Sequence, residues 1–306
     1  MTRFLTARLL RSLLTLWLVF TVVFVASRLS GDPIQLLYPD GLSLEAEATM
    51  REYLGLDRSL FEQYTKYVSG LFRGDLGNSF FQRRDVGVMF TERLPATVSL
   101  ALYAFLLSLV TGVPAGIAAA LNRGRLPDRL IMAASFFSYA LPNFVLGIAL
   151  ILVFSFSLHL LPSSGQGSWR HFLMPVATLG LSSAAGIARF TRSAMLDVLT
   201  QDYLRTARSK GLAATQVISK HALRNAAIPV LTIVGLQVGT LVTGSVVVET
   251  VFAWPGIGSL LADAATRRDF PVMQIGVLIV AASVIVANLL VDIGYGLLDP
   301  RIRVEA

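Results

Sequence analysis

The chain alternates between long apolar stretches and short polar segments. A helix needs about 20 mostly apolar residues to cross the hydrocarbon of a bilayer, and six stretches reach or approach that length: 9–27, 97–121, 130–158, 172–188 with an extension to about 195, 228–251 and 272–297. Strand-like alternation of apolar and polar residues is missing between them. The first stretch could also be a cleaved signal peptide, but the weak cleavage site around Val25, Ala26 and Ser27 favours an uncleaved span. The pattern predicts an all-α membrane protein with six transmembrane helices.

The positions of Lys and Arg predict the orientation of these helices. Cytoplasmic loops carry an excess of basic residues when short loops are compared. With both termini cytoplasmic, the two short outer loops contain only Arg170, Arg267 and Arg268. The inner segments then contain the remaining clusters: Arg3, Arg8 and Arg11; Arg123, Arg125 and Arg129; those from Arg189 to Arg224; and Arg301 and Arg303. We therefore expect both termini in the cytoplasm.

The segment between the first two spans differs from the other loops. Residues 29–95 contain ten acidic and seven basic residues, a balance typical of a small soluble insert. Ser59 and Glu62 form a capping box, in which each side chain satisfies a free backbone N–H of the other residue. Gly74 is placed to end the helix that follows. The domain plan is thus an N-terminal transmembrane helix (1–28), a helical periplasmic insert (29–95) and a five-helix core (96–306).

A basic segment lies between the fourth and fifth spans. Residues 205–225 contain five Lys or Arg and no acidic residue. We expect two short helices here, 197–209 and 213–227, with Gly211 between them in the left-handed conformation that ends helices. Ala207 is small enough to allow close approach of another surface. This segment could dock a soluble partner, or it could be a basic anchor for anionic lipid headgroups.

Composition excludes several classes of function. The chain is 54% hydrophobic and only 15% charged, with a mean hydropathy of +0.66, and soluble domains carry about 25% charged residues. The net charge of +7 follows from basic residues that border apolar runs, so it does not indicate nucleic acid. No lysine is followed by Ser or Thr as a P-loop requires. Cysteine is absent and the three histidines are dispersed, so we expect no metal site and no catalytic residue.

Two sets of residues connect the chain to a known family. The stretch DYLRTARSKGLAATQVISKHALRNAAIPVLTIVGLQ resembles the cytoplasmic signature loop of permease subunits of bacterial ABC importers, in the branch for dipeptides, oligopeptides, glutathione and nickel. Thr206, Ala207 and Arg208 lie around the E-A-A part of that signature, Gly211 at its glycine, and His221 to Arg224 at its I-x-L-P part. The stretches GDLGNSF (74–80) and VVVETVFAWPGIGSLL (246–261) resemble the same branch.

The resemblance implies a function and a set of partners. The expected assembly contains a second homologous permease, two cytoplasmic ATPases that bind ATP and Mg²⁺, and a periplasmic substrate-binding protein, all at the bacterial inner membrane with its lipid. No cofactor is expected in this chain. Di- or oligopeptides are the expected cargo, with glutathione or a nickel chelate as alternatives and a stand-alone ion-coupled carrier as a different class. The expected ATPase-coupling residues are Arg205, Thr206, Ala207, Arg208, Lys210, Gly211, His221 and Arg224.

The outer loop after the fifth span is the second candidate site. We expect Glu249, Trp254, Pro255 and Gly256 to form an outer gate, with the Trp254 ring at the membrane interface, where aromatic residues are enriched. Glu249 could be a carboxylate in contact with water at the end of the span, or a group in the pathway, since ionisable residues inside membranes are often functional.

Overall fold

The fold is seen in a computed structural model that describes residues 2–29, 31–32, 34–35, 38 and 41–298. The described residues are helical apart from turns and one isolated bridge between Asn78 and Asp85, as the all-α prediction required. They divide into two compact units. Unit 1 contains 96–255 and the end of the chain from residue 283, and unit 2 contains 2–95 and 256–282.

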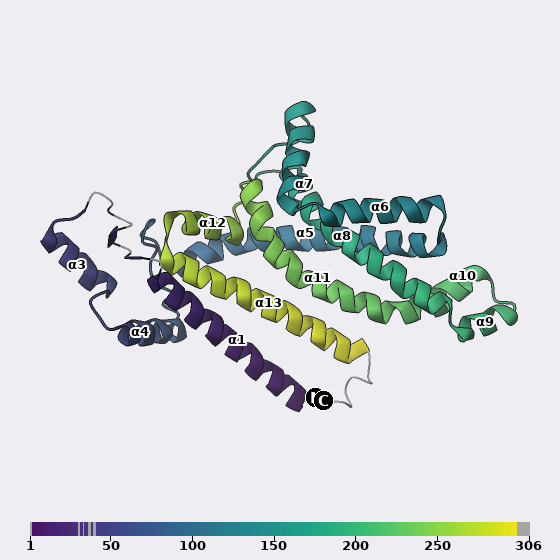
Figure 1. The fold of residues 1–306 in the computed structure, drawn as a ribbon, viewed down its shortest axis with the longest axis horizontal. Coiled ribbons are helices and arrows are strands. Elements are labelled where there is room, and N and C mark those ends of the chain that lie inside the picture. The colour runs from purple at the N-terminus through teal and green to yellow at the C-terminus, as the bar shows by residue number, and fades with distance from the viewer. Residues whose placement is uncertain (1, 30, 33, 36–37, 39–40, 299–306) are drawn as a thin grey trace. The chain divides into compact units, whose positions relative to one another are not determined.

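The helices follow the predicted order of apolar stretches (Figure 1). In the described part, five helices are long and apolar enough to cross a membrane, and a sixth span is reached if one bent pair counts as a span. The helices are α1 (Thr2–Leu29), α3 (Leu44–Leu54), α4 (Leu60–Arg73), α5 (Val86–Leu121), α6 (Leu126–Ala140), α7 (Asn143–Leu150), π-helix η1 (Ile151–Ser157), α8 (Trp169–Leu199), α9 (Asp202–Ser209), α10 (Ala214–Gln216), π-helix η2 (Val217–Ala222), α11 (Leu223–Val251), α12 (Ile257–Arg267) and α13 (Phe270–Leu298).

The third predicted span is not one straight helix. The helices α6 and α7 with η1 meet at an angle of 104°. Leu141, at the break, has extended backbone with ψ 125°, because the ring of the following Pro142 disfavours the helical conformation at the residue before it. The apolar stretch 130–158 therefore forms two helical segments that meet just before Pro142 rather than one straight span.

Small residues let α5 and α8 pack closely in unit 1. A Cβ atom on Gly116 would lie 2.5 Å from the Ala188 carbonyl oxygen, and one on Gly112 would lie 2.8 Å from the Ala184 carbonyl oxygen. No side chain fits at such distances, so glycine is required at both positions. This close approach follows the rule that membrane helices associate through small residues.

Unit 2 contains the predicted insert helices α3 and α4. The capping box of Ser59 and Glu62 is present, and Gly74 ends α4 in the left-handed conformation, as predicted. Rings of α1 and α4 pack together, with the Phe20 and Tyr67 centroids 4.9 Å apart. The Asp269 carboxylate accepts hydrogen bonds from the Ser79 hydroxyl at 2.5 Å and from two following backbone N–H groups, which ties the loop before α5 to the start of α13.

Helix α5 begins at Val86, upstream of the apolar stretch that predicted it. Its first turns belong to unit 2, where Val86, Met89 and Phe90 are buried. They pack in one cluster with Ile257 and Ile275. The helix therefore continues into the insert because its first turns have an apolar face to bury, and hydropathy alone does not reveal that face among the charged residues there.

Candidate functional site

The basic segment forms a hairpin, here defined as residues 202–226. Its first arm is α9, which begins after Gln201 rather than at residue 197, because α8 continues to Leu199. Gly211 connects the arms with φ +78°, the left-handed conformation expected of it. The second arm is not a separate helix: α10, η2 and α11 follow one another without a break, since neither glycine nor proline occurs between residues 212 and 228.

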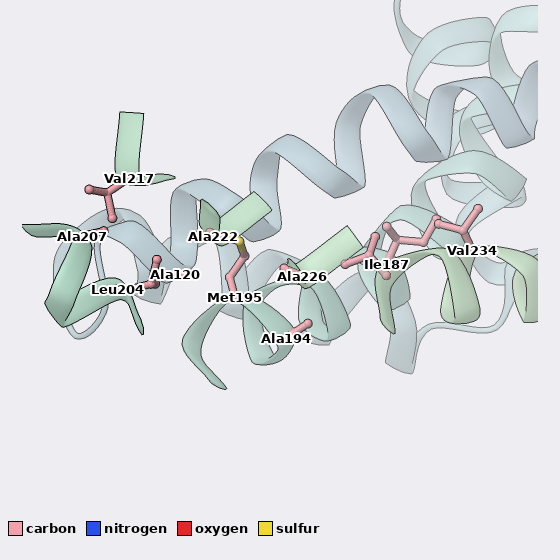
Figure 2. Packing of buried hydrophobic residues seen from close by; sticks show 11 residues of the cluster. Ala120, Ile187, Ala194, Met195, Leu204, Ala207, Val217, Ala222, Ala226 and Val234 are labelled. Carbon is pink, nitrogen blue, oxygen red and sulfur yellow. The ribbon is translucent and has the colours of Figure 1, made fainter. Parts of the chain in front are cut away.

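The hairpin rests on the ends of three long helices of unit 1. Leu204 and Ala207 of α9 are buried against Val217 and Ala222 of η2. Figure 2 shows this cluster continuing from the hairpin towards the helix interiors; its other buried members are Ala120 of α5, Ile187, Ala194 and Met195 of α8, and Ala226, Val230 and Val234 of α11. Ala207 is only 7% exposed, so its small side chain serves the hairpin's own packing. A displacement of the hairpin would move the helix ends that share this cluster.

The cations of the hairpin lie on its outer surface. Arg205, Arg208, Lys210, Lys220 and Arg224 are exposed, as are Thr206 and Gly211, whereas His221 is half-buried. The Arg205 side chain is 83% exposed and its nearest carboxylate, that of Asp202, is 3.9 Å away. The predicted residues therefore divide into a packed inner side and a basic outer side, which is available to a soluble partner or to lipid headgroups.

The second candidate site is buried instead of exposed. Glu249 and Trp254 are both 0% exposed. The Thr97 hydroxyl donates to the Glu249 carboxylate at 2.8 Å, and the Trp254 indole N–H donates to the Ala96 carbonyl at 3.0 Å. Of the two alternatives for Glu249, contact with water does not fit this burial, and the expected membrane-interface position of Trp254 was wrong, because the start of the core part of α5 supplies a hydrogen-bond partner to each.

Ala253 is one of the two exposed residues of this turn, the other being Thr250. Ala253 has φ +45°, a conformation that residues other than glycine seldom adopt. The Trp254 ring packs edge-on against Phe172 with centroids 4.5 Å apart. Pro255 is half-buried, and Gly256 is the buried N-cap residue of α12. The turn from Glu249 to Trp254 is therefore held from inside by a hydrogen-bonded carboxylate and indole.

A polar cavity of about 360 Å³ lies inside unit 1. Arg189 of α8 lines it together with Tyr139, Asn143, Ser182, Gln237 and Thr240. The Arg189 guanidinium lies 4.3 Å from the centre of the Tyr139 ring, and its Nε is buried without a hydrogen-bond partner in the described part of the chain. A Cβ on Gly186 would collide with the Gln237 amide, so glycine keeps the space beside that amide open.

Sequence analysis placed Arg189 with the inner basic residues and missed this cavity. The signal in the sequence was that Arg189 lies inside the helix predicted from an apolar stretch. Ionisable residues inside membrane helices are energetically costly and commonly line a substrate or ion pathway. The residues that line the cavity together with Arg189 come from α6, α7, α8 and α11, which a single sequence does not bring together.

An ion pair that sequence analysis also missed joins α6 to α8. Arg192 binds Asp128 through both carboxylate oxygens, at 2.6 and 2.8 Å. The Gly124 N–H donates to the same carboxylate at 2.8 Å, and Asp128 is 3% exposed. The paired geometry satisfies a carboxylate that would otherwise be costly to bury, and it fixes the position of α6 beside α8.

Comparison with known proteins decides the family. Residues 112–304 match the model of the binding-protein-dependent transport system inner membrane component, and residues 1–101 match the N-terminal model of such components. The chain belongs to this family. Among curated permeases, the glutathione transport system permease protein GsiC of Escherichia coli O6:H1 is 43% identical over 304 residues, which cover 99% of both chains. The protein of that name from Salmonella paratyphi A is 42% identical over the same length.

Solved structures share the fold of this permease. The methionine ABC transporter MetNI in an inward-facing conformation matches with a TM-score of 0.60 and 18% identity, over 69% of this chain and 96% of that one. An amino acid ABC transporter matches with a TM-score of 0.57 and 15% identity, over 68% of this chain and 94% of that one. These matches show the fold alone.

Together the comparisons establish what kind of subunit this is. It is an ABC importer permease of the peptide and glutathione branch and a multi-pass protein of the inner membrane. Subunits of this family are generally non-catalytic, and ATP hydrolysis belongs to partner subunits. Within the described residues, no three His, Asp or Glu side chains gather as a metal site would require.

Proposed function

We propose that this chain forms half of the translocation pathway of an ATP-driven, binding-protein-dependent importer. A second homologous permease supplies the other half, two ATPases with ATP and Mg²⁺ supply the energy, and an external binding protein delivers the cargo. Membership of the family supports this assembly.

The hairpin 202–226 couples the permease to the ATPases in this proposal. The observation that carries the proposal is its two-sided construction: exposed cations outside, and inside an apolar cluster shared with α5, α8 and α11. ATP-driven movement of the ATPases displaces the hairpin, and the shared cluster transmits that displacement to three helices. For import to be driven, ATP must favour one arrangement of these helices over another.

The polar cavity of unit 1 is the part of the pathway that this chain supplies. Its half-buried cation Arg189 suits a cargo with a carboxylate, because hydrogen bonds between guanidinium and carboxylate are among the strongest in proteins. Small anionic peptides have that chemistry. The curated relatives named above are glutathione permeases with 42–43% identity, so glutathione is the first cargo to test, ahead of other di- and oligopeptides and of nickel chelates.

The turn from Glu249 to Trp254 supports the outer end of the pathway in this proposal. Glu249 and Trp254 act from inside by fixing the turn, and Ala253 is one of its two exposed residues. A cysteine at Ala253 should react with an impermeant thiol reagent added from outside, more slowly when the binding protein is docked.

Reconstituted transport tests the proposal. We expect ATP-dependent uptake of labelled glutathione only when the second permease, the ATPases and the binding protein are all present. Arg189→Gln should lower uptake about tenfold or more, because it removes a charged hydrogen bond to the cargo, while the ATPases remain bound. Arg170→Gln, an exposed residue away from the cavity, is the matched control. Uptake by this chain alone under an ion gradient would contradict the proposal and favour a carrier.

A further inference from the structure

A short polar turn joins α5 to α6 within unit 1. Together with the first residues of α6 it has the sequence NRGRLPDR, residues 122–129. Because α5 and the bent pair that begins with α6 are both candidate spans, the turn between them lies at a surface of the membrane. Figure 1 shows the turn at the same end of unit 1 as the hairpin, and Ala120, at the end of α5, belongs to the cluster under the hairpin.

The one carboxylate of this segment is withdrawn from the surface. The Asp128 side chain is only 4% exposed, and it is held by Arg192 of α8 and by the Gly124 N–H. The cations of the segment are exposed: Arg123, Arg125 and Arg129. Within the described residues, none of these three has an ion pair. Since Arg192 already neutralises the acid, the segment presents three positive charges that no carboxylate balances.

The exposed face of α6 changes character along the helix. Residues three or four apart share one face of a helix, so Arg125 and Arg129 lie together at its start, and the buried Asp128 and Ser135 lie on another face. Large apolar side chains continue the exposed face: Leu126, Leu130, Phe136 and Phe137, each 60–67% exposed. The face is therefore cationic at the membrane surface and apolar further along, which is the arrangement of a lipid headgroup and its acyl chains.

We propose that this face of α6 binds an anionic phospholipid. The phosphate group accepts hydrogen bonds from the Arg125 and Arg129 guanidinium groups, whose geometry suits phosphate oxygens. Arg123 adds attraction for the negative charge, and an acyl chain packs along Leu130 and Phe137. An acidic protein surface would match the cations but not the apolar continuation of the face, so the observations favour a lipid. The site needs no cargo, no ATP and no partner subunit, and it goes beyond the proposed function.

Native mass spectrometry of the purified full-length permease tests the site, because it counts bound lipids and gives an affinity for each. Phosphatidylglycerol would be compared with phosphatidylcholine, which has no net charge, and with glycerol 3-phosphate, which has no acyl chain. We expect phosphatidylglycerol to bind more tightly than either. The double variant Arg125→Gln with Arg129→Gln should lower its affinity about tenfold or more, because two basic residues near the headgroup are lost.

Two further variants separate this site from a general effect of charge. The double variant Arg58→Gln with Arg73→Gln removes the same charge from exposed positions of the insert, and phosphatidylglycerol affinity should stay near wild type. Leu130→Ala shortens the apolar part of the α6 face and leaves its cations in place. This variant should bind phosphatidylglycerol several-fold more weakly, because apolar contact with the acyl chain is lost.

The outcomes separate the lipid site from the transport proposal, since the binding is measured without cargo or ATP. A preference for phosphatidylglycerol that depends on Arg125 and Arg129, and persists in the insert control, supports the site whatever uptake measurements give. Equal phosphatidylglycerol affinity in wild type and the α6 double variant would overturn it. Glycerol 3-phosphate binding as tight as that of phosphatidylglycerol would overturn it too and assign the cations to a soluble phosphate compound.

The assembled importer provides the last comparison. We expect phosphatidylglycerol to remain bound, with the same dependence on Arg125 and Arg129, when the second permease and the ATPases are present. Loss of this binding on assembly would show that the α6 face contacts a protein subunit, and the lipid site would then be rejected.

Discussion

The hairpin 202–226 and the turn from Glu249 to Trp254 are two connections of the same unit with opposite construction. The hairpin buries alanine and apolar side chains and exposes five cations. The turn buries a carboxylate and an indole, each hydrogen-bonded to the first turn of the core part of α5, and exposes Ala253. In the sequence, the hairpin and the turn are both polar or aromatic segments between apolar stretches.

Exposed charged residues and buried polar residues therefore contribute to the protein in different ways. Exposed charges act on a partner across water, where salt screens them and each contributes little. Buried polar groups act on the fold itself, where loss of a partner leaves an unsatisfied group at considerable cost. Substitutions in the turn should therefore change stability first, and substitutions in the hairpin should change association and coupling first.

The largest expected effect is that of Trp254→Ala. Removal of a fully buried tryptophan costs about 3–5 kcal/mol through lost contacts and a cavity, so the thermal unfolding temperature of the detergent-solubilised permease should fall clearly. Trp169→Ala is the matched control, because that ring is 68% exposed and its removal should change the unfolding temperature little. Similar shifts for both variants would mean that the turn is not held from inside.

The next effect concerns the hydrogen bond between Thr97 and Glu249. Thr97→Val keeps the side-chain shape and removes the donor at 2.8 Å, which should lower the free energy of unfolding by about 0.5–1.5 kcal/mol, the contribution of a typical intramolecular hydrogen bond. Thr111→Val, on the same helix, removes a hydroxyl that bonds only a carbonyl of its own helix at 2.7 Å. Thermal unfolding of both variants checks the difference, and an equal or larger loss for Thr111→Val would contradict the buried carboxylate.

The smallest effect on stability is expected for Arg205→Glu in the hairpin. Its side chain is 83% exposed, so the unfolding temperature should stay within the range of an ordinary surface change. Retention of the ATPases during purification should fall instead, and more at low salt than at high salt, where surface charges are screened. Arg170→Glu provides a control with the same charge change outside the hairpin. Unchanged retention at both ionic strengths would make the basic surface a lipid anchor only.

Local rules made several features predictable from the sequence. The capping box at Ser59, the helix end at Gly74 and the left-handed Gly211 depend on a few neighbouring residues, and all three are present. The resemblance of whole motifs then gave the family.

Features that depend on distant partners were not predictable. Trp254 looks amphipathic in the sequence, and only the Ala96 carbonyl, supplied from another helix, makes its burial favourable. The unit 1 cavity around Arg189 and the ion pair of Asp128 with Arg192 likewise join helices that one sequence does not place side by side. The continuity of α11 with the hairpin was missed because a polar segment was assumed to interrupt the helix.

The effect of Gly211→Val on coupling tests the central claim most directly. Gly211 has φ +78°, and a Cβ there would meet no atom within 4 Å, so the substitution acts only through backbone strain of about 1–3 kcal/mol. Gly165→Val applies the same strain outside the hairpin, at φ +88° and also in open space. We would measure ATPase retention and substrate-stimulated ATP hydrolysis of the assembled importer with each variant. The account predicts that both quantities fall in Gly211→Val and stay near wild type in Gly165→Val; wild-type values in Gly211→Val would contradict the role of the hairpin in coupling.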